Sequence, residues 1–418
     1  MNFIKEGKWA KMNRVNELIK EYCPDGVEIR CLEDCCNLLD KKRKPITKAA
    51  REAGEYPYYG ANGIQDYVAN YIFDGTFVLV GEDGSVITKS GTPVVTWAEG
   101  KIWVNNHAHI IEEKDGVMLR YLYHYLQTID VTSLIHGNIP KLTGGDFKAL
   151  KIAVPPLEVQ REIVHVLDSF TLLTAELTAE LTVRKKQYEF YRNKLLSHDG
   201  KYPMKPLADL GKWSGGKTPS MSEKNFWEQG TIPWISSKDM KASTLIDTKD
   251  HITEKAVTEA SMTVYPANSV AIVTRSGILK HTFPVAYVPF ETTINQDIKM
   301  LVVNEDILPR YAFHVIQGKG KDILIKTKKQ GGTVDSLDFQ KVLAYKVPVP
   351  SKDIQSRLVE VLDNFESICT DLNIGLPAEI EARKKQYKYY RDLLLTFAET
   401  GSTLMTDRQT DRQTDRQS

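Results

Sequence analysis

One glycine-rich stretch of this 418-residue sequence has the spacing of a phosphate-binding loop. The residues GKWSGGKT, Gly211–Thr218, fit the pattern GxxxxGK(S/T), in which backbone N–H groups cradle a nucleotide phosphate. Such a loop must follow a buried strand and open a helix. The preceding residues, KPLADL, are short and polar, and Pro219 removes one N–H from the helical turn that would be needed. We therefore interpret the stretch as a glycine-rich turn.

A second group of residues has side chains suited to reading nucleic acid. Arginine offers paired donors to guanine O6 and N7, asparagine and glutamine pair with adenine, and lysine contacts phosphate. Arg275 is the strongest candidate for a guanine contact. In the first half of the chain the predicted DNA-binding residues are Lys41, Lys42, Arg43, Lys44, Tyr59, Asn62, Ser85, Lys89, Asn106, Asn138 and Lys141. In the second half they are Lys217, Ser236, Ser237, Lys238, Arg275, Ser276, Lys280, Asn295, Gln296, Lys328, Lys329 and Gln330.

These candidates lie in loops that match between the two halves. The loops Gly81–Ser90 and Thr274–His281 each follow a β-like run and contain glycine, serine and lysine. Tyr58 and Trp234 also hold matching places, where we expect buried aromatic rings. Further matched stretches are Asn105-Asn106-His107 with Asn295-Gln296, and the region of His136, Asn138 and Lys141 with that of Lys328 and Lys329. The alternative for each cationic loop is a solvated surface without a ligand.

The motifs of DNA-modifying and DNA-cutting enzymes are missing from the sequence. An adenine-N6 methyltransferase needs an (N/D)PP(Y/F/W) tetrapeptide to grip its flipped base, but Val154 precedes Pro155-Pro156. A nuclease cluster of the PD…(D/E)xK type is missing too, because Pro24-Asp25 with Glu28 lacks the closing lysine. We therefore expect no catalytic residues.

The composition, 42% hydrophobic and 26% charged, is typical of a folded soluble protein. No apolar run approaches the roughly 20 residues that cross a bilayer, and the N-terminus lacks an apolar signal core, so we expect a cytoplasmic protein. The net charge of +1 gives no general attraction to nucleic acid. The five cysteines, an odd number, favour reduced thiols, and their spacing predicts no metal site.

The chain carries the same plan twice. RKKQYEFYRNKLL from Arg184 matches RKKQYKYYRDLLL from Arg383, and VPPLEVQREIVHVLDSF from Val154 matches VPVPSKDIQSRLVEVLDNF from Val347. A duplicated segment–arm plan predicts a pseudo-two-fold molecule, which suits duplex DNA or a pair of identical subunits. The predicted divisions are an N-terminal extension with a short helix (1–26), a first α/β domain (27–153), a central helical arm (154–202), a second α/β domain (203–346), a C-terminal helical arm (347–398) and a disordered repeat tail (399–418).

The arms are expected to be long helices that share a coiled-coil seam. Apolar residues from Val159 to Leu195 recur at spacings of three, four or seven, as do those from Ile354 to Leu394. The stretch from Glu158 to Leu196 has 39 residues, which as a helix would be about 58 Å long. A helix of this length with such a seam needs a partner, and the second arm is the obvious one.

The arms differ by one four-residue unit. Two units, TAEL and TAEL, follow Leu173, whereas three, CTDL, NIGL and PAEI, follow Ile368. One additional unit adds about 6 Å of helix while keeping the seam nearly in phase. Gly375 and Pro377 lie in the second and third of these units, so we expect the second helix to break there.

Both arms end in a basic-aromatic block whose residues are predicted to dock a partner subunit. The alternative is a solvated helix face. The predicted partner-binding residues are Arg184, Lys185, Lys186, Tyr188, Tyr191, Arg192, Arg383, Lys384, Lys385, Tyr387, Tyr390 and Arg391.

Taken together, these motifs resemble the specificity subunits of type I restriction–modification systems. The resemblance extends from Met12 to Phe397 and includes CPDGVEIRCLEDC, the VPPLEVQ-type start of each arm, the TAEL units and both RKKQY…YYR blocks. GGKTPS…FWEQGTIPWISSKDM, from Gly215 to Met240, resembles the opening of target recognition domains in that family.

The resemblance implies a non-catalytic protein in which two target recognition domains each read half of a split DNA site. It implies that the arms form an antiparallel coiled coil, which separates the domains and docks two modification subunits that methylate adenine at N6. Restriction subunits are a further implied partner. The chain would need no cofactor, because S-adenosylmethionine, ATP and magnesium would belong to the partner subunits.

Two other classes of protein stay open from the residues alone. One is a self-sufficient enzyme such as a P-loop NTPase, and the other is a structural coiled-coil protein without a role on DNA. The tail TDRQTDRQTDRQ, Thr406–Gln417, has no apolar residue and is expected to be disordered. Its period matches a repeated ACAG tetranucleotide, which predicts slippage and phase variation, with a duplicated codon block as the alternative.

Overall fold

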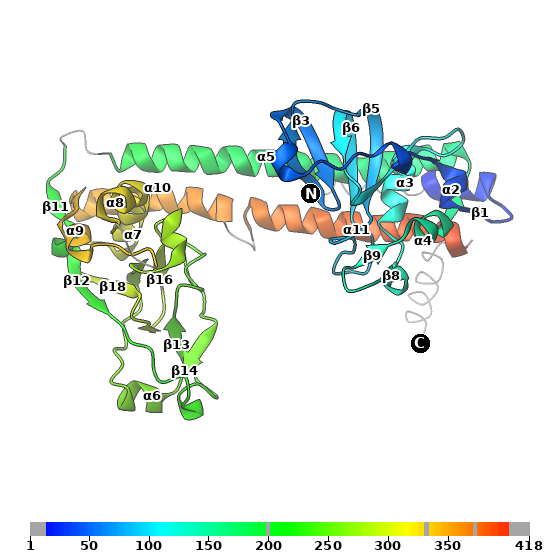
Figure 1. Ribbon diagram of the computed structural model, residues 1–418. Coiled ribbons are helices and arrows are strands. Elements are labelled where there is room, and N and C mark those ends of the chain that lie inside the picture. Colours follow the sequence, from blue (N-terminus) through cyan, green and yellow to red (C-terminus); the bar gives the residue numbers. More distant parts are fainter. Residues whose placement is uncertain (1–13, 198–200, 330–333, 371–373, 401–418) are drawn as a thin grey trace, which may run out of the picture. The chain divides into compact units, whose positions relative to one another are not determined.

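The computed structural model describes residues 14–197, 201–329, 334–370 and 374–400, the side chains of the last four excepted. The chain divides into two compact units, one formed by Met1–Leu177 with Ile380–Ser418 and the other by Thr178–Glu379. Each unit holds one α/β domain and parts of the long helices (Figure 1). The predicted fold class, α+β with two tandem α/β domains joined by long helical arms, is confirmed.

The domain of the first unit is built on a six-stranded sheet of order β2-β7-β5-β6-β3-β4. Its strands β5 (Phe73–Gly81), β6 (Val95–Val104) and β7 (Ala108–Glu112) are rich in β-branched and aromatic residues, which favour strands. The strand β5 pairs antiparallel with both β6 and β7, whereas β3 (Ala53–Gly60) runs parallel to β6. The other elements are β1 (Glu28–Cys31), α2 (Leu32–Cys35), β2 (Asn37–Leu38), β4 (Gly63–Val68), α3 (Leu119–Leu126), β8 (Ile135–His136), β9 (Lys141–Leu142), α4 (Gly144–Ala149) and β10 (Lys151–Val154).

The domain of the second unit has two smaller sheets, of order β12-β18-β15-β16 and β14-β13-β17. Its central strand β15 (Ser269–Val273) is buried along its whole length and pairs antiparallel with β16 (Val285–Val288) and β18 (Ile298–Val303). The helix α7 (Pro309–Gly318) packs against this sheet. The other elements are β11 (Met204–Pro206), β12 (Gly211–Gly215), β13 (Ile232–Ile235), β14 (Asp250–Ile252), α6 (Glu254–Glu259), β17 (Thr293–Ile294), α8 (Gly320–Thr327), α9 (Phe339–Ala344) and β19 (Lys346–Pro348).

The stretch Gly211–Thr218 is not a phosphate-binding loop, and it is not the turn that we expected. Residues 211–215 form the strand β12, and residues 216–223 contain no helix. A Cβ on Gly211 would lie 2.1 Å from the carbonyl oxygen of Val302, and one on Gly216 would lie 1.8 Å from that of Ile294. The glycines are therefore needed for close strand packing.

Each domain begins and ends on one short strand pair, β1 with β10 in the first unit and β11 with β19 in the second. A fully buried tyrosine fixes each pair to the domain helix: Tyr121 donates to the carbonyl of Ala153 over 2.8 Å, and Tyr311 donates to that of Pro348 over 2.8 Å. The repeat in the sequence is therefore also a repeat of contacts.

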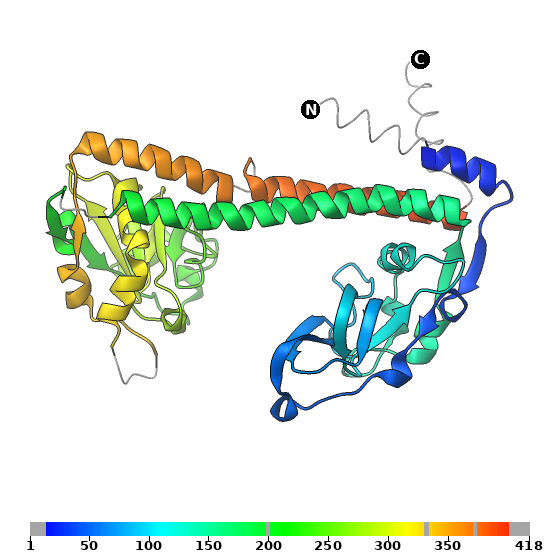
Figure 2. The ribbon, with the colours of Figure 1, turned by 90° about the horizontal axis from the view of Figure 1, so that it is seen from above.

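The predicted 39-residue helix is present one residue earlier, as α5 (Leu157–Leu195). It starts directly after Pro155-Pro156, because proline is tolerated ahead of a helix and in its first turn but not beyond it. The second arm is broken, as predicted, into α10 (Lys352–Thr370) and α11 (Leu376–Thr400), with Pro377 in the first turn of α11. Figure 2 shows α5 beside each of these helices.

The helices pair through aromatic contacts within each unit. In the first unit Phe170 of α5 stacks on Tyr390 of α11 with ring centroids 5.1 Å apart. In the second, Tyr191 of α5 stacks on Phe365 of α10 at 5.8 Å. The early part of α5 thus contacts the later helix of the second arm and its late part contacts the earlier one, which is antiparallel pairing.

A buried glutamine ties the start of each arm to its domain. Gln160 accepts from the Met118 N–H at 2.9 Å and donates to the Pro155 carbonyl at 2.7 Å. Gln355 makes the matching contacts with Leu308 and Pro350, at 2.8 and 2.9 Å. Buried polar groups that are fully paired in this way fix one orientation of helix and domain.

The helix expected near the N-terminus is present over residues 14–22, and its apolar face joins the core of the first unit. The repeat tail lies outside the described residues. Among the helices of the described ranges, none combines the length and the apolar character that crossing a bilayer takes.

Candidate nucleic-acid interface

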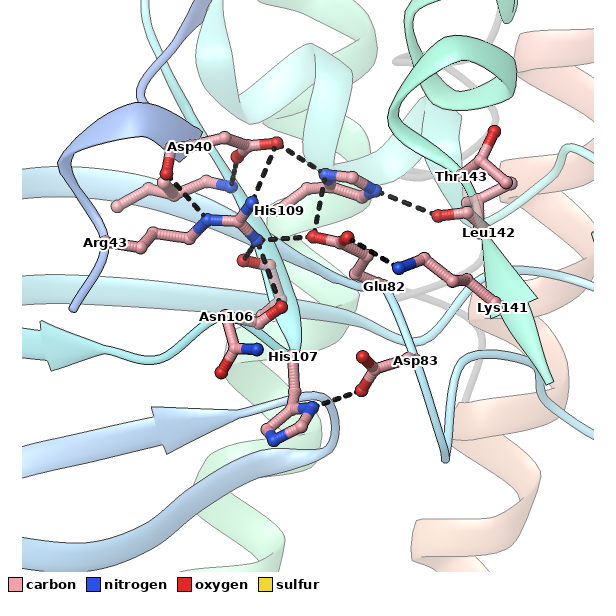
Figure 3. A network of polar contacts seen from close by, with 12 residues as sticks. Asp40, Arg43, Glu82, Asp83, Asn106, His107, His109, Lys141, Leu142 and Thr143 are labelled. Atoms are coloured by element: carbon pink, nitrogen blue, oxygen red, sulfur yellow. Dashed lines mark hydrogen bonds and ion pairs between the residues drawn. The ribbon is translucent and has the colours of Figure 1, made fainter. Parts of the chain in front are cut away.

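Three loops of the first domain converge where β5 ends (Figure 3). The Glu82 N–H donates to the His107 carbonyl in the turn between β6 and β7, at 2.8 Å. The Glu82 carbonyl accepts from the Leu142 N–H at 2.9 Å, and the Gly84 N–H donates to the Pro140 carbonyl at 2.9 Å. The loop after β5 is therefore held between the β6–β7 turn and the β8–β9 hairpin.

The second domain repeats these three backbone contacts. The Thr274 N–H donates to the Asp297 carbonyl at 2.8 Å, the Leu337 N–H donates to the Thr274 carbonyl at 2.9 Å, and the Ser276 N–H donates to the Asp335 carbonyl at 3.0 Å. Glu82 and Thr274 thus occupy one position of a shared scaffold.

A fourth contact fixes the tip of the β6–β7 turn and its counterpart. The Asn105 N–H donates to the Tyr59 carbonyl at 3.1 Å, and the Asn295 N–H donates to the Ile235 carbonyl at 3.0 Å. Each asparagine side chain then accepts from the backbone two residues later, at 2.8 Å from His107 and 3.0 Å from Asp297. The next residues, Asn106 and Gln296, are left exposed at the tip.

Most of the predicted DNA-binding residues lie at the surface on or beside these loops. Tyr58 and Trp234, predicted to be buried, are 1% and 7% exposed. Ser237 and Ser276 are half-buried. The exposed members are Lys41, Lys42, Lys44, Asn62, Ser85, Lys89, Asn106, Asn138, Lys141, Lys217, Lys238, Arg275, Lys280, Gln296, Lys328 and Lys329. Gln330 lies outside the described residues.

Four of the predicted residues have internal roles, and we leave them out of the interface. The Arg43 guanidinium donates to Glu82 at 2.6 Å and to the Ala108 carbonyl at 2.7 Å, with 12% of its side chain exposed. Ser236 is buried and bonded to Asp239 at 3.0 Å. The remaining two, Tyr59 and Asn295, are buried as well. Arg43, Tyr59 and Asn295 contact residues far away along the chain, which a sequence window does not contain, whereas the partner of Ser236 is close in sequence.

A charged network beneath the first domain's loops holds Arg43 in place. His109 is stacked on Phe147, with ring centroids 4.2 Å apart, and bonds to Asp40 through Nδ1 at 2.6 Å. Burial alone would raise the pKa of Asp40, but its hydrogen bond to His109 and the Arg43 charge outweigh burial and lower it. The carboxylate is therefore charged and paired at neutral pH.

Among the residues that the structure describes, two clusters have ligand atoms close enough for a metal ion: Asp40 with Glu82 and His109, and His314 with Asp363 and Glu366. In each, an arginine already supplies the positive charge. Arg43 pairs with Glu82 at 2.6 Å, and Arg310 pairs with Glu366 at 2.7 Å. We therefore interpret both as internal ion-pair networks.

Two tyrosines of the basic-aromatic blocks bond to buried histidines of the domains. Tyr387 bonds to His124 of α3 at 2.8 Å, and Tyr188 bonds to His314 of α7 at 3.3 Å. Burial raises the pKa of both tyrosines. Tyr191 and Tyr390 lie in the aromatic stacks between the arms.

The two arginines that end the blocks also have partners in the chain. Arg192 donates to Gln317 at 2.7 Å, and the buried Arg391 pairs with Asp392 at 2.7 Å. The exposed members of the blocks are Arg184, Lys185, Lys186, Tyr191, Lys384 and Lys385, with Arg383 half-buried.

Sequence reasoning missed the buried histidines that receive these tyrosines. His124 and His314 occupy the same place in YLYHYLQ and YAFHVIQ, and each bonds to an aspartate of an arm, Asp168 at 2.9 Å and Asp363 at 2.6 Å. The recurrence of His and Asp in both halves was the available signal. It was overlooked because a lone histidine carries no pattern of its own.

Comparison with known proteins gives one consistent family. A sequence model described as "Type I restriction modification DNA specificity domain" matches residues 24–183 and again 200–382. The EcoR124I/EcoR124II specificity subunit of Escherichia coli is 46% identical over 293 residues, 68% of this chain and 72% of that protein. A Haemophilus influenzae protein named as a type I restriction enzyme specificity subunit is 34% identical over 390 residues, 89% and 96% of the two chains.

Solved structures agree on the fold. The S subunit of a type I restriction–modification system from M. genitalium covers 90% of this chain and 96% of its own, with a TM-score of 0.51 and 17% identity. A structure titled for complex assembly and conformational transition of the type I R-M system covers 90% and 97%, with a TM-score of 0.52 and 13% identity. The chain therefore belongs to the specificity subunits of type I restriction–modification systems, the non-catalytic subunits that recognise DNA.

Proposed function

We propose that this chain recognises two different DNA half-sites separated by a spacer, one half by each α/β domain. The observation that supports this most is the loop scaffold shared by Glu82 and Thr274, which has the same backbone hydrogen bonds in both units but different side chains at matching positions. A repeated backbone scaffold that carries different side chains suits a bipartite, non-palindromic target. The proposed domain bounds are residues 27–153 and 203–346.

The proposed contacts are the exposed and half-buried members of the predicted set. Lysines would position each domain on phosphate, and amide, hydroxyl and guanidinium groups would read base edges. In the first domain they are Lys41, Lys42, Lys44, Asn62, Ser85, Lys89, Asn106, Asn138 and Lys141. In the second they are Lys217, Ser237, Lys238, Arg275, Ser276, Lys280, Gln296, Lys328 and Lys329.

The exposed basic residues of the arms are the proposed docking sites for two adenine-N6 modification subunits. Two matching blocks, at Arg184–Lys186 and Arg383–Lys385, favour two copies of one partner. Two restriction subunits are a further proposed partner. S-adenosylmethionine, ATP and magnesium would be bound by those partners, and the complex would work in the cytoplasm.

Native mass spectrometry of the chain with modification subunits tests the docking sites. Lys185→Glu and Lys384→Glu should each remove one copy of the modification subunit, and the double variant both. Lys148→Glu, an exposed lysine on α4, is the matched control and should keep both copies. Two bound copies in the double variant would refute the docking proposal and leave DNA recognition untouched.

A further inference from the structure

One backbone position carries opposite charges in the two domains. Asp83 forms an antiparallel bridge with Lys141, and Arg275 forms the matching bridge with Ser336. Asp83 follows Glu82 and Arg275 follows Thr274, whose three backbone hydrogen bonds are the same in both domains. The two side chains therefore leave the scaffold at the same point, one as a carboxylate and the other as a guanidinium.

The residue at the neighbouring turn differs as well. The first domain has His107 where the second has Asp297, since each of these carbonyls accepts the hydrogen bond from the matching N–H of Glu82 or Thr274. In the first domain one oxygen of Asp83 is paired with Nδ1 of His107 (Figure 3). The side chains of Asp83 and His107 are 24% and 47% exposed, so the pair lies at the surface of the interface.

The charged residues beneath the loops pair with one another and not with Asp83. Lys141 pairs with Glu82 at 3.4 Å, and Arg43 pairs with Glu82 and with Asp40. An additional carboxylate among these loops weakens attraction to the phosphates of DNA. That cost is offset if the carboxylate accepts a hydrogen bond from a base.

We propose that Asp83 is a base-reading residue of the first domain and accepts a hydrogen bond from an exocyclic amine, N4 of cytosine or N6 of adenine, in the major groove. His107 holds one carboxylate oxygen and leaves the other for the amine. A carboxylate only accepts hydrogen bonds, so the acceptors O6 and N7 of guanine and O4 of thymine are rejected at this place. Arg275, at the matching place, has the opposite preference, for guanine. The inference depends on the proposed function, because it needs this surface to face DNA.

Methylation-aware sequencing of cells that carry the complete complex gives the first test. With Asp83→Ala, sites that carry the wrong base at one position of one half-site should be methylated about tenfold more than by the wild type. The spacer and the other half-site should stay unchanged. Asp74→Asn is the matched control, an exposed aspartate at the opposite end of β5, and should leave the motif intact.

Amine deletion in synthetic DNA gives the second test and separates the two bases. A duplex in which purine replaces adenine, or a cytosine analogue without N4 replaces cytosine, at the relaxed position should bind the wild-type complex about tenfold more weakly. The Asp83→Ala complex should bind the altered duplex and the unaltered duplex with equal affinity. The analogue that weakens binding identifies the base.

The outcomes distinguish this inference from the proposed function. An unchanged motif for Asp83→Ala, or relaxation spread over several positions, would overturn the role of Asp83 while the bipartite motif of the wild type stands. Equal sensitivity of wild-type and variant complexes to amine deletion would overturn it too. A wild-type motif without two half-sites would contradict the proposed function itself.

Discussion

Tyr387 of α11 contacts His124 of α3 over 2.8 Å, and this hydrogen bond joins the end of the second arm to the first domain. The other ring nitrogen of His124 bonds to the Asp168 carboxylate of α5 at 2.9 Å. Since a carboxylate only accepts, Nε2 carries the proton and Nδ1 of the neutral ring accepts from the tyrosine. One fully buried ring therefore bridges a domain and both arms, and His314 does the same in the second unit.

Removal of the tyrosine hydroxyl should destabilise the unit it serves. Tyr387→Phe leaves Nδ1 of His124 buried without a donor, which costs about 1–3 kcal/mol of unfolding free energy. Urea unfolding of the full chain measures the loss. Tyr389→Phe, whose parent side chain is 54% exposed, is the control and should change stability little. Equal stability of the two variants would argue against the bridge.

Stability should fall in mild acid because of the same histidines. Burial lowers the pKa of His124 and of His314, against the raising effect of the aspartate that bonds to each. Between the folded and the unfolded pKa of these histidines, the unfolded chain binds more protons than the folded one. Their contribution to stability is therefore complete above the unfolded histidine pKa of about 6.5, and it is lost as pH falls toward the folded pKa. The pKa of Asp168 and of Asp363 is lowered as well, so those carboxylates titrate below this window.

The measurement is the urea midpoint between pH 5.5 and pH 7.5. It should fall on acidification in the wild type, and the fall should be smaller in the double variant His124→Gln with His314→Gln. His165→Gln, at an exposed position of α5, serves as control. The same pH slope in the double variant and the wild type would exclude these two residues as the cause.

Sequence periodicity was enough to predict the arms, because a seam at helical spacing and the helix-breaking pair Gly375 and Pro377 act locally. The start of α5 was predicted to within one residue for the same reason. The inward orientation of Arg43 depends on Glu82, and that of Tyr188 depends on His314, which are far away along the chain. Only the folded structure shows that Arg43 and Tyr188 have hydrogen-bond partners inside the chain.

The matched loops were also visible in the sequence, but the significance of their differences was not. The sequence predicts Arg275 as a guanine contact because it is a guanidinium in a glycine-containing loop, whereas Asp83 is not among the predicted residues. Its equivalence to Arg275 becomes visible once the hydrogen bonds of Glu82 and Thr274 are compared.

Arg275 should determine the identity of one base pair in the second half-site. Arg275→Ala should cost about 1–3 kcal/mol of discrimination there and leave the first half-site unchanged. Lys280→Ala, in the same loop, should weaken binding to all sequences and reduce its salt dependence instead. Binding measurements on a duplex library at two salt concentrations distinguish the two effects, and a relaxed first half-site would contradict the assignment of Arg275.

The length of α5 should set the spacer between the half-sites. One further TAEL unit after Leu181 adds about 6 Å of continuous helix, against about 3.4 Å per base pair of DNA. The spacer in the methylated motif should therefore grow by one or two base pairs while both half-sites stay the same. A motif with the original spacing would show that the arms do not set the length of the spacer between the half-sites.

The most direct test of bipartite recognition is the methylome of cells that express this chain with its modification subunits. We expect adenine methylation at a site with two different half-sites and a fixed unspecified spacer, and no such methylation when either this chain or the modification subunit is omitted. A continuous palindrome, or methyl transfer by the purified chain alone, would contradict the account.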